Sequence, residues 1–204
     1  MSEKRMISDT GYEVKRSQWI GGTEYLMAEN PKAHADERFM VCDYTQNAFL
    51  GQYANAVVDG NGMEAISEYN KRVYEALDKV SAELDSRGLP SELFIAEHCI
   101  PHSYEQDING KVVAIKADCL SPEYRRGSEQ LVYVTGGFGA NANSRGNAVY
   151  CYQLSDKKQV RFERYQVLGI VKELPDWAKD CLIAVNEQIA ADRAKSNRGR
   201  NDAR

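Results

Sequence analysis

Hydrophobic and polar residues in the first 60 positions of the chain follow the short, alternating pattern that is typical of β-strands. Gly21-Gly22 forms a natural turn between two of these strands, and Asn30-Pro31 interrupts the pattern again. The strands expected here are residues 12–15, 19–20, 23–27, 39–42, 48–50 and 56–58. The N-terminal part of the chain is therefore predicted to be rich in short, turn-connected strands.

An amphipathic helix is predicted to follow, beginning at Asn61. Asn61 and Glu64, three residues later, match the reciprocal capping pattern of helix starts. Apolar residues then recur at steps of three and four, which places them on one helix face. These residues are Met63, Ile66, Tyr69, Val73, Leu77, Val80 and Leu84. Gly88 and Pro90 are residue types that end helices, so the helix is expected to stop just before them.

The second half of the chain repeats the order of strands followed by a helix. Strands are predicted at residues 111–116, 130–135, 147–154, 160–162 and 165–171. Because no helical pattern separates these strands, they are expected to pair as an antiparallel sheet or a small barrel. Pro175 opens a last helix. One face of this helix is expected to pack on the sheet through Trp177, Cys181, Leu182, Val185 and Ile189.

These patterns predict an α+β fold with two strand-rich lobes, each followed by an amphipathic helix. Residues 1–90 form the N-terminal strands and helix, and residues 91–110 form a connection that includes a short helical turn at 93–97. Residues 111–190 form the C-terminal sheet and helix, and residues 191–204 form a basic tail.

The composition is ordinary for a soluble globular protein that buries a real core. Of the 204 residues, 43% are hydrophobic and 27% are charged. The start of the chain is polar and has no secretory signal pattern, and no apolar run is long enough to span a membrane. The five cysteines include no C-x-x-C pair, which favours reduced thiols over a disulfide framework. A cytoplasmic protein without membrane contact is expected.

Charge is unevenly distributed along the chain. The net charge is −4, but residues 191–204 carry five basic and two acidic side chains, a net charge of +3 that leaves −7 for residues 1–190. An acidic body argues against a domain that coats nucleic acid and suits a partner for a basic protein. The tail is either a solvated chain end or a weak contact for phosphate or an acidic partner.

The first candidate motif is a glycine-rich segment, residues 137–142, which satisfies the G-x-G-x-x-A pattern directly after a predicted strand. A dinucleotide site also needs a helix whose N-terminal amides face the pyrophosphate, and here a strand follows within a few residues. Nucleotide binding is therefore disfavoured. Four glycines within residues 136–146 permit close backbone approach, so with Phe138 and Arg145 this loop is either a recognition loop or a flexible, bulged connection.

The second candidate motif places Glu97, His98, Cys99 and His102 within six residues. Pro101 prevents a regular helix from placing both imidazoles on one face, and the chain offers no second ligand pair with metal-site spacing. A cysteine–histidine pair is formally possible, but adjacency in sequence does not build a dyad. We therefore expect no metal, no cofactor and no catalytic residue, which favours a protein that is not an enzyme.

The third candidate motif is the basic and aromatic segment that contains Tyr124, Arg125 and Arg126. Its arginines are suited to clamp a phosphate or a carboxylate while Tyr124 stacks on the ligand. Alternatively, the two arginines form surface ion pairs with Glu123 and Glu129.

Several phrases of the sequence together resemble a group of small, uncharacterised accessory proteins from conjugative elements and prophages of Gram-positive gut bacteria. The phrases are DTGYEV at residues 9–14, IGGTE at 20–24, KVVAIK at 111–116, PEYRRG at 122–127, QLVYVTGGFGA at 130–140, RFERY at 161–165 and LPDWA at 174–178. The resemblance spans most of the chain and implies a mobile genetic element as the genomic setting. It also implies anti-defence activity of the anti-restriction or anti-CRISPR kind, exerted by binding.

Two classes of function follow from these observations. The first is a non-enzymatic inhibitor of a host defence nuclease that acts by protein–protein contact, with an acidic surface or a tyrosine-rich sheet meeting the partner. The alternative is a nucleic-acid-binding accessory factor that uses Arg125, Arg126, Arg145 and the basic tail.

Overall fold

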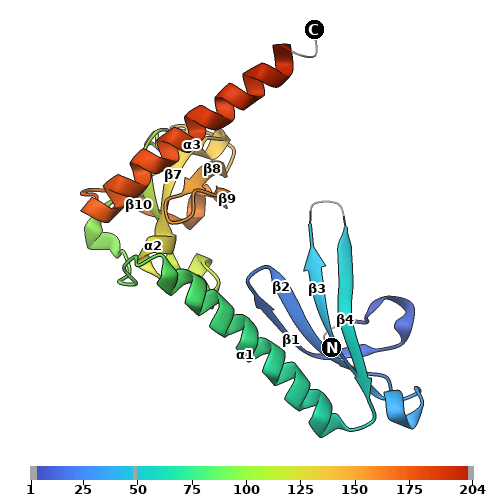
Figure 1. Ribbon diagram of the computed structural model, residues 1–204. Helices are drawn as coiled ribbons and strands as arrows, with labels where there is room; N and C mark the ends of the chain where they lie inside the picture. The colour runs from blue at the N-terminus through green and yellow to red at the C-terminus, as the bar shows by residue number, and fades with distance from the viewer. Residues whose placement is uncertain (1–3, 48–49, 202–204) are drawn as a thin grey trace. The chain divides into compact units, whose positions relative to one another are not determined.

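The chain forms two compact units, Met1–Ser86 and Arg87–Arg204, in a computed structural model that describes residues 4–47 and 50–201 (Figure 1). Each unit contains one antiparallel sheet and one long α-helix. The predicted α+β fold class, with strands preceding a helix in each half, is therefore confirmed.

The first unit is a four-stranded meander followed by a helix. Its elements are β1 (Glu13–Ile20), β2 (Thr23–Glu29), β3 (Phe39–Gln46), β4 (Gly51–Asp59) and α1 (Gly62–Ser86). The strands pair in the order β1-β2-β3-β4, each antiparallel to the next. Gly21 and Gly22 both have positive φ, at 59° and 87°, which confirms the predicted turn between β1 and β2. The strand predicted at 48–50 lies largely outside the described residues.

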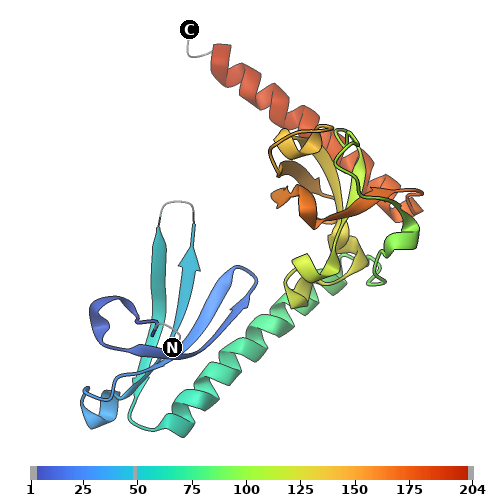
Figure 2. The ribbon, with the colours of Figure 1, turned by 180° about the vertical axis from the view of Figure 1, so that it is seen from behind.

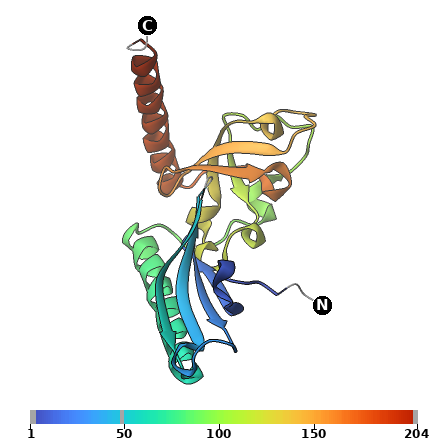
Figure 3. The ribbon, with the colours of Figure 1, turned by 90° about the vertical axis from the view of Figure 1, so that its right-hand side faces the viewer.

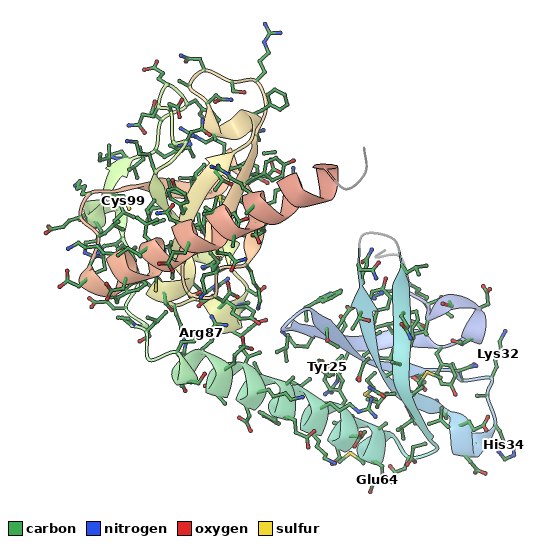
Figure 4. The ribbon with its side chains drawn as sticks, turned by 45° about the horizontal axis from the view of Figure 1, so that its top comes forward. Tyr25, Lys32, His34, Glu64, Arg87 and Cys99 are labelled. Atoms are coloured by element: carbon green, nitrogen blue, oxygen red, sulfur yellow. The ribbon has the colours of Figure 1, made fainter. Side chains whose placement is uncertain are left out.

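Both faces of the first sheet contribute buried side chains, because successive residues of a strand point to opposite faces. Met27 and Val41 point to one face and pack against Ala65 and Tyr69 of α1. Helix α1 lies on this side of the sheet and not on the other (Figure 3). Tyr25 extends from β2 toward α1 on this side (Figure 4). The opposite face carries Leu26, Ala28 and Cys42, which are buried together with Ile7 and Tyr12 of the N-terminal segment.

Helix α1 begins at the predicted cap but buries a face that differs in part from the predicted one. The Asn61 Oδ1 accepts a hydrogen bond from the Met63 N–H at 2.9 Å, while the Asn61 N–H donates to Asp59 rather than to Glu64. Met63, expected in the apolar stripe, is exposed, and Ala65 and Ala76 are buried. Alanine contributes little to a hydrophobic pattern in the sequence, so the two alanines were not expected on the buried face. Their small side chains let the helix approach the sheet closely, and the buried face of α1 therefore includes them.

Arg72 locks α1 to the sheet of the first unit. Its guanidinium donates to Asp43 of β3 at 3.1 Å, to the Asn55 carbonyl of β4 at 2.8 Å and to Glu68 of its own helix at 2.7 Å. Asn55 is the bulged residue of β4, with φ 53°, and its carboxamide also donates to Asp43. One half-buried cation therefore fixes the position of the helix and of the strand irregularity beside it.

The second unit is a six-stranded antiparallel sheet with a helix on one face (Figure 2). Its strands are β5 (Cys99–Pro101), β6 (Val112–Ile115), β7 (Leu131–Gly136), β8 (Ala148–Gln153), β9 (Gln159–Glu163) and β10 (Val167–Val171), in the order β5-β10-β6-β7-β8-β9. The short helix α2 (Gly127–Gln130) precedes β7, and α3 (Asp176–Asn201) closes the unit. Residues 91–110, expected only as a connection, supply β5 as an edge strand of this sheet.

Both faces of the second sheet are buried. Ala178 and Val185 of α3 are fully buried against one face, with Trp177, Cys181, Leu182 and Ile189 packed around them, as the spacing of these residues predicts. The other face is covered by connecting segments that contribute Ile108 and Ala140. Helix α3 continues to Asn201, so the backbone of most of the expected basic tail is helical. Side chains from residue 195 onward lie outside the description.

None of the helices in the described part of the chain has the length and apolar content needed to cross a membrane.

Replacing Arg72 is expected to destabilise the first unit. Arg72→Met retains much of the aliphatic volume but removes the hydrogen bonds to Asp43, Glu68 and Asn55, which predicts a loss of about 2 kcal/mol in the free energy of unfolding. Urea denaturation followed by circular dichroism measures this loss. Lys71→Met, on the exposed neighbouring position, is the matched control and should change stability by less than about 0.5 kcal/mol. Equal effects of the two substitutions would contradict the role of Arg72.

Candidate functional site

The candidate site is a pair of interlocked loops at one end of the second unit, residues 103–109 and 136–147, which we call the loop platform. The Ile108 N–H donates to the Ala140 carbonyl at 2.9 Å, and the Asn143 N–H donates to the Tyr104 carbonyl at 2.8 Å. Side chains add a third link, because the Asn109 carboxamide donates to Asn141 at 2.8 Å. The two loops therefore form one hydrogen-bonded structure.

The glycines of the predicted recognition loop allow close backbone contacts within the loop platform. Gly137 has φ 103°, a conformation that other residues rarely adopt, and Gly139 lies so close to Asn147 that an added Cβ would sit 2.3 Å from its carbonyl oxygen. A single 3-10 turn, Phe138–Ala140, follows these glycines, and the chain then runs irregularly to β8. This segment lacks the helix N-terminus on which a pyrophosphate would rest.

Arg164 is the buried centre of the loop platform. It is only 1% exposed, and its guanidinium donates to three carbonyls: Ser103 at 2.6 Å, Gln106 at 2.8 Å and Gly139 at 3.1 Å. Its Nε donates to the Nε2 of His102 at 3.1 Å, and its own N–H donates to the Asn147 carbonyl at 2.7 Å. The four groups that accept hydrogen bonds from the guanidinium, three carbonyls and one imidazole, are neutral. Burial lowers the pKa of the guanidinium below its ordinary value.

The loop platform presents an exposed aromatic side chain on this rigid base. Phe138 is 75% exposed, the highest value among the large hydrophobic residues that the structure describes as exposed. Tyr104 is also exposed, and Arg145 is exposed on the same loop as Phe138. Two of the predicted site residues, Phe138 and Arg145, therefore belong to one surface loop. A large apolar side chain that a hydrogen-bonded loop holds in solvent is typical of a residue that contacts a binding partner.

The histidine and cysteine motif is dispersed by the fold. His102 faces Arg164, whereas the Nδ1 of His98 lies 3.4 Å from the Ile95 N–H, and His98 is exposed on the wall of a hollow of about 780 Å³ lined also by Phe94 and Trp177. Cys99 is buried in β5 within the core of the unit, and burial raises the pKa of its thiol, which weakens it as a nucleophile (Figure 4).

No three histidine, cysteine, aspartate or glutamate side chains gather closely enough to hold a metal ion in the regions that the structure describes.

The basic and aromatic motif lies in a different part of the second unit from the loop platform. The Arg125 Nε donates to the Leu120 carbonyl at 3.1 Å, and Arg126 is the residue before α2. The Gly127 N–H donates to Ser91, which ties this segment to the chain before β5. Tyr124 is half-buried. Glu129, which the sequence suggested as a partner for these arginines, forms an ion pair with Arg87 at 3.0 Å.

A second group of aromatic side chains lies on the first unit. Trp19, Glu24, Tyr44 and Tyr53 are successive register partners across the four strands, on the face opposite α1. The rings of Tyr44 and Tyr53 lie 4.8 Å apart, and those of Trp19 and Tyr44 lie 6.1 Å apart. Arg5 binds the buried Glu24 carboxylate with both terminal nitrogens, at 2.5 and 2.6 Å. Arg5 thereby ties the N-terminal segment to this row.

Sequence reasoning missed Arg164, Tyr104 and the pairing of the two loops. Arg164 lies three residues from Arg161, which is exposed on β9, and nothing in the local sequence distinguishes a buried arginine from an exposed one. The only local signal is the Glu163-to-Gln166 spacing, which indicates a capped turn and is realised by a 2.7 Å bond from the Glu163 N–H to Gln166.

Comparisons with protein-family models, with curated proteins and with solved structures find no match to this chain. The site is therefore interpreted from its geometry and chemistry.

Removing the Arg164 guanidinium is expected to loosen the loop platform. Arg164→Met leaves three carbonyls without their donor, which predicts a loss of about 3 kcal/mol in the free energy of unfolding. Amide hydrogen exchange should rise at Ile108 and Asn143, whose N–H groups join the two loops. Arg161→Met is the matched control, and it should leave exchange at these amides unchanged. Unchanged protection at both amides in Arg164→Met would refute the role of Arg164.

Stability is expected to fall in mild acid because of His102. Burial, and then the charges of Arg164 and Lys116, lower the pKa of His102 below its ordinary value of 6.5. The unfolded chain therefore binds a proton more readily than the folded chain, so stability is lost as the pH falls below the ordinary value of 6.5. His102→Gln retains an acceptor for Arg164 but does not titrate, and it should flatten this part of the profile.

The matched control for His102 is His34→Gln, since His34 is exposed in the first unit (Figure 4). Urea denaturation at several pH values should give the same acid slope for this variant as for the wild type. An unchanged slope in His102→Gln would assign the acid sensitivity to other groups.

Proposed function

We propose that this protein is a non-catalytic binding protein of a mobile genetic element, and that it inhibits a host defence nuclease by protein–protein contact through the loop platform. The observation that carries this proposal is the exposure of the aromatic residue Phe138 on a loop whose backbone is hydrogen-bonded to the buried Arg164.

A rigid loop supports this proposal on energetic grounds. Binding usually costs free energy to order the side chains and loops of an interface, and a loop that is already fixed avoids much of this cost. The hydrogen bonds of Arg164 to Ser103, Gln106 and Gly139 hold both loops in place before any partner arrives. Aromatic residues that insert into a partner's pocket supply a large share of the binding free energy in many interfaces.

Charge supports a basic partner. Residues 1–190 carry a net charge of −7, which attracts a protein with a positively charged nucleic-acid channel and accelerates its association. The resemblance to accessory proteins of conjugative elements and prophages supports a defence nuclease as that partner, of either the CRISPR or the restriction type.

The alternative function, nucleic-acid binding, receives less support from the geometry. Arg125 donates to a backbone carbonyl of its own loop, and Arg145 is not grouped with Arg125 or Arg126 in one surface loop. The acidic body would repel a phosphate backbone. A gel-shift assay at low salt distinguishes the two functions, because the proposed inhibitor should not retard DNA or RNA.

Phe138→Ala is expected to abolish most of the inhibition without affecting the fold. Guide-loaded CRISPR nucleases and restriction endonucleases of Gram-positive bacteria are assayed for cleavage of a matched DNA target, with and without the protein. For the nuclease that the wild type inhibits, Phe138→Ala should raise the inhibitor concentration needed for half-inhibition by about 30-fold, which corresponds to about 2 kcal/mol. Thermal unfolding should be unchanged, because this side chain is exposed.

Tyr74→Ala is the matched control for Phe138→Ala. Tyr74 is another exposed aromatic residue, 67% exposed on α1 of the first unit, and its replacement should leave inhibition intact. Equal loss of inhibition in both variants would exclude the loop platform as the contact surface. Absence of inhibition across the nuclease panel, or retardation of nucleic acid at low salt, would count against the proposed function itself.

A further inference from the structure

The second unit has a solvent-open hollow of about 780 Å³ between the segment that precedes β5 and the turn from β10 into α3. Its lining residues come from 90–98 and from 172–179, and none of them belongs to the loop platform. Phe94, Leu174 and Trp177 are partly buried against the core of the unit and supply much of the apolar lining. We call this feature the aromatic hollow. Half-buried aromatic rings on a concave surface are typical of sites that take up a side chain of a partner.

The walls of the aromatic hollow are fixed by hydrogen bonds. The carboxamide of the fully buried Gln130 accepts a hydrogen bond from the Phe94 N–H at 2.7 Å and donates to the Phe94 carbonyl at 3.1 Å. Lys172 joins the two walls, because its N–H donates to the His98 carbonyl at 3.0 Å and its ammonium group donates to the Glu97 carbonyl at 2.9 Å. A ligand therefore meets a preformed surface, which lowers the free-energy cost of ordering on binding.

The aromatic hollow carries an excess of negative charge. Four carboxylates and two ammonium groups line it: Glu92, Glu97, Glu173, Asp176, Lys172 and Lys179. Lys179 pairs with Asp176 at 2.8 Å and is also attracted by Glu173. In the part of the chain that the structure describes, the carboxylates of Glu92 and Glu97 have neither a hydrogen bond nor an ion pair. Two carboxylates in the same hollow as two aromatic rings are thus available to a cation.

We infer that the aromatic hollow binds an arginine side chain of a partner protein, whose guanidinium stacks on the aromatic rings and pairs with the carboxylates of Glu92 and Glu97. A guanidinium is planar, always charged and weakly hydrated, so it stacks on aromatic faces while its N–H groups donate to carboxylates. A lysine ammonium group is more strongly hydrated and has no planar face to stack. An anionic ligand would meet the excess of negative charge. Charge and shape therefore select arginine.

The two tryptophans of the chain allow a direct test by NMR. Trp177 lines the aromatic hollow and Trp19 lies in the first unit, so the proton–nitrogen spectrum contains two indole N–H signals, which Trp19→Phe assigns. The probe is the blocked tripeptide Gly-Arg-Gly, added at low salt from about 0.1 to about 20 mM. The Trp177 signal should shift and saturate with a dissociation constant of about 1 mM, because a single side chain makes the contact. The Trp19 signal should not move.

Two further peptides separate charge from shape. In the first, citrulline replaces arginine, which keeps the planar, branched end of the side chain but removes its charge. This peptide should bind at least about 10-fold more weakly than the arginine peptide, because it cannot pair with the carboxylates. In the second, lysine replaces arginine and keeps the charge without the planar face. Its affinity should be about 3-fold lower than that of the arginine peptide.

Glu92→Gln and Glu97→Gln test the two carboxylates. Each should raise the dissociation constant of the arginine peptide by about 3-fold, which is typical for the loss of one exposed ion pair. Both residues are exposed, so both variants should fold, which the thermal unfolding midpoint verifies. Glu187→Gln is the matched control, since Glu187 is exposed on α3 and does not line the aromatic hollow. It should bind the arginine peptide like the wild type.

Three results would overturn the inference. They are a Trp177 signal that stays unmoved at about 20 mM arginine peptide, an affinity for the citrulline or lysine peptide equal to that for the arginine peptide, and wild-type affinity in both Glu92→Gln and Glu97→Gln. The inference stands on the aromatic hollow alone and agrees with the basic partner of the proposed function. Because none of these measurements uses a nuclease, their outcome is independent of the proposed inhibition.

Discussion

The candidate binding surface of this protein depends on one buried guanidinium. Arg164 carries its charge into the interior of the second unit without a carboxylate, and three carbonyls and a neutral imidazole satisfy its donors. Such an arrangement is stable only if every donor finds an acceptor, because an unsatisfied buried charge is costly. The requirement also acts in reverse, since the carbonyls of Ser103, Gln106 and Gly139 must converge on one point. Two irregular loops thereby acquire a defined shape, and Phe138 acquires a defined position.

The first unit uses its cations differently. Arg5 and Arg72 meet carboxylates, Glu24 in one case and Asp43 with Glu68 in the other, and each joins an element to the sheet. Arg5 fixes the irregular N-terminal segment and Arg72 fixes a helix, each through a carboxylate, whereas Arg164 fixes irregular backbone through neutral acceptors.

The loop platform has the physical character of a binding surface. Phe138 projects from a fixed loop and is suited to enter a pocket of an unlike partner.

The sequence by itself determined the α+β class, the two long helices and the position of most strands, because hydrophobic period, glycine turns and helix caps are local properties of the chain. It also identified Phe138 and Arg145 as members of one glycine-rich loop. It missed β5, whose three residues become a strand only by pairing with β10, and it placed Met63 in a buried stripe that runs through Ala65 and Ala76. Only the tertiary structure decided that Arg164 is buried and that His98, Cys99 and His102 point apart. Each of these depends on contacts between residues distant in sequence, and local patterns carry no information about which distant groups will meet.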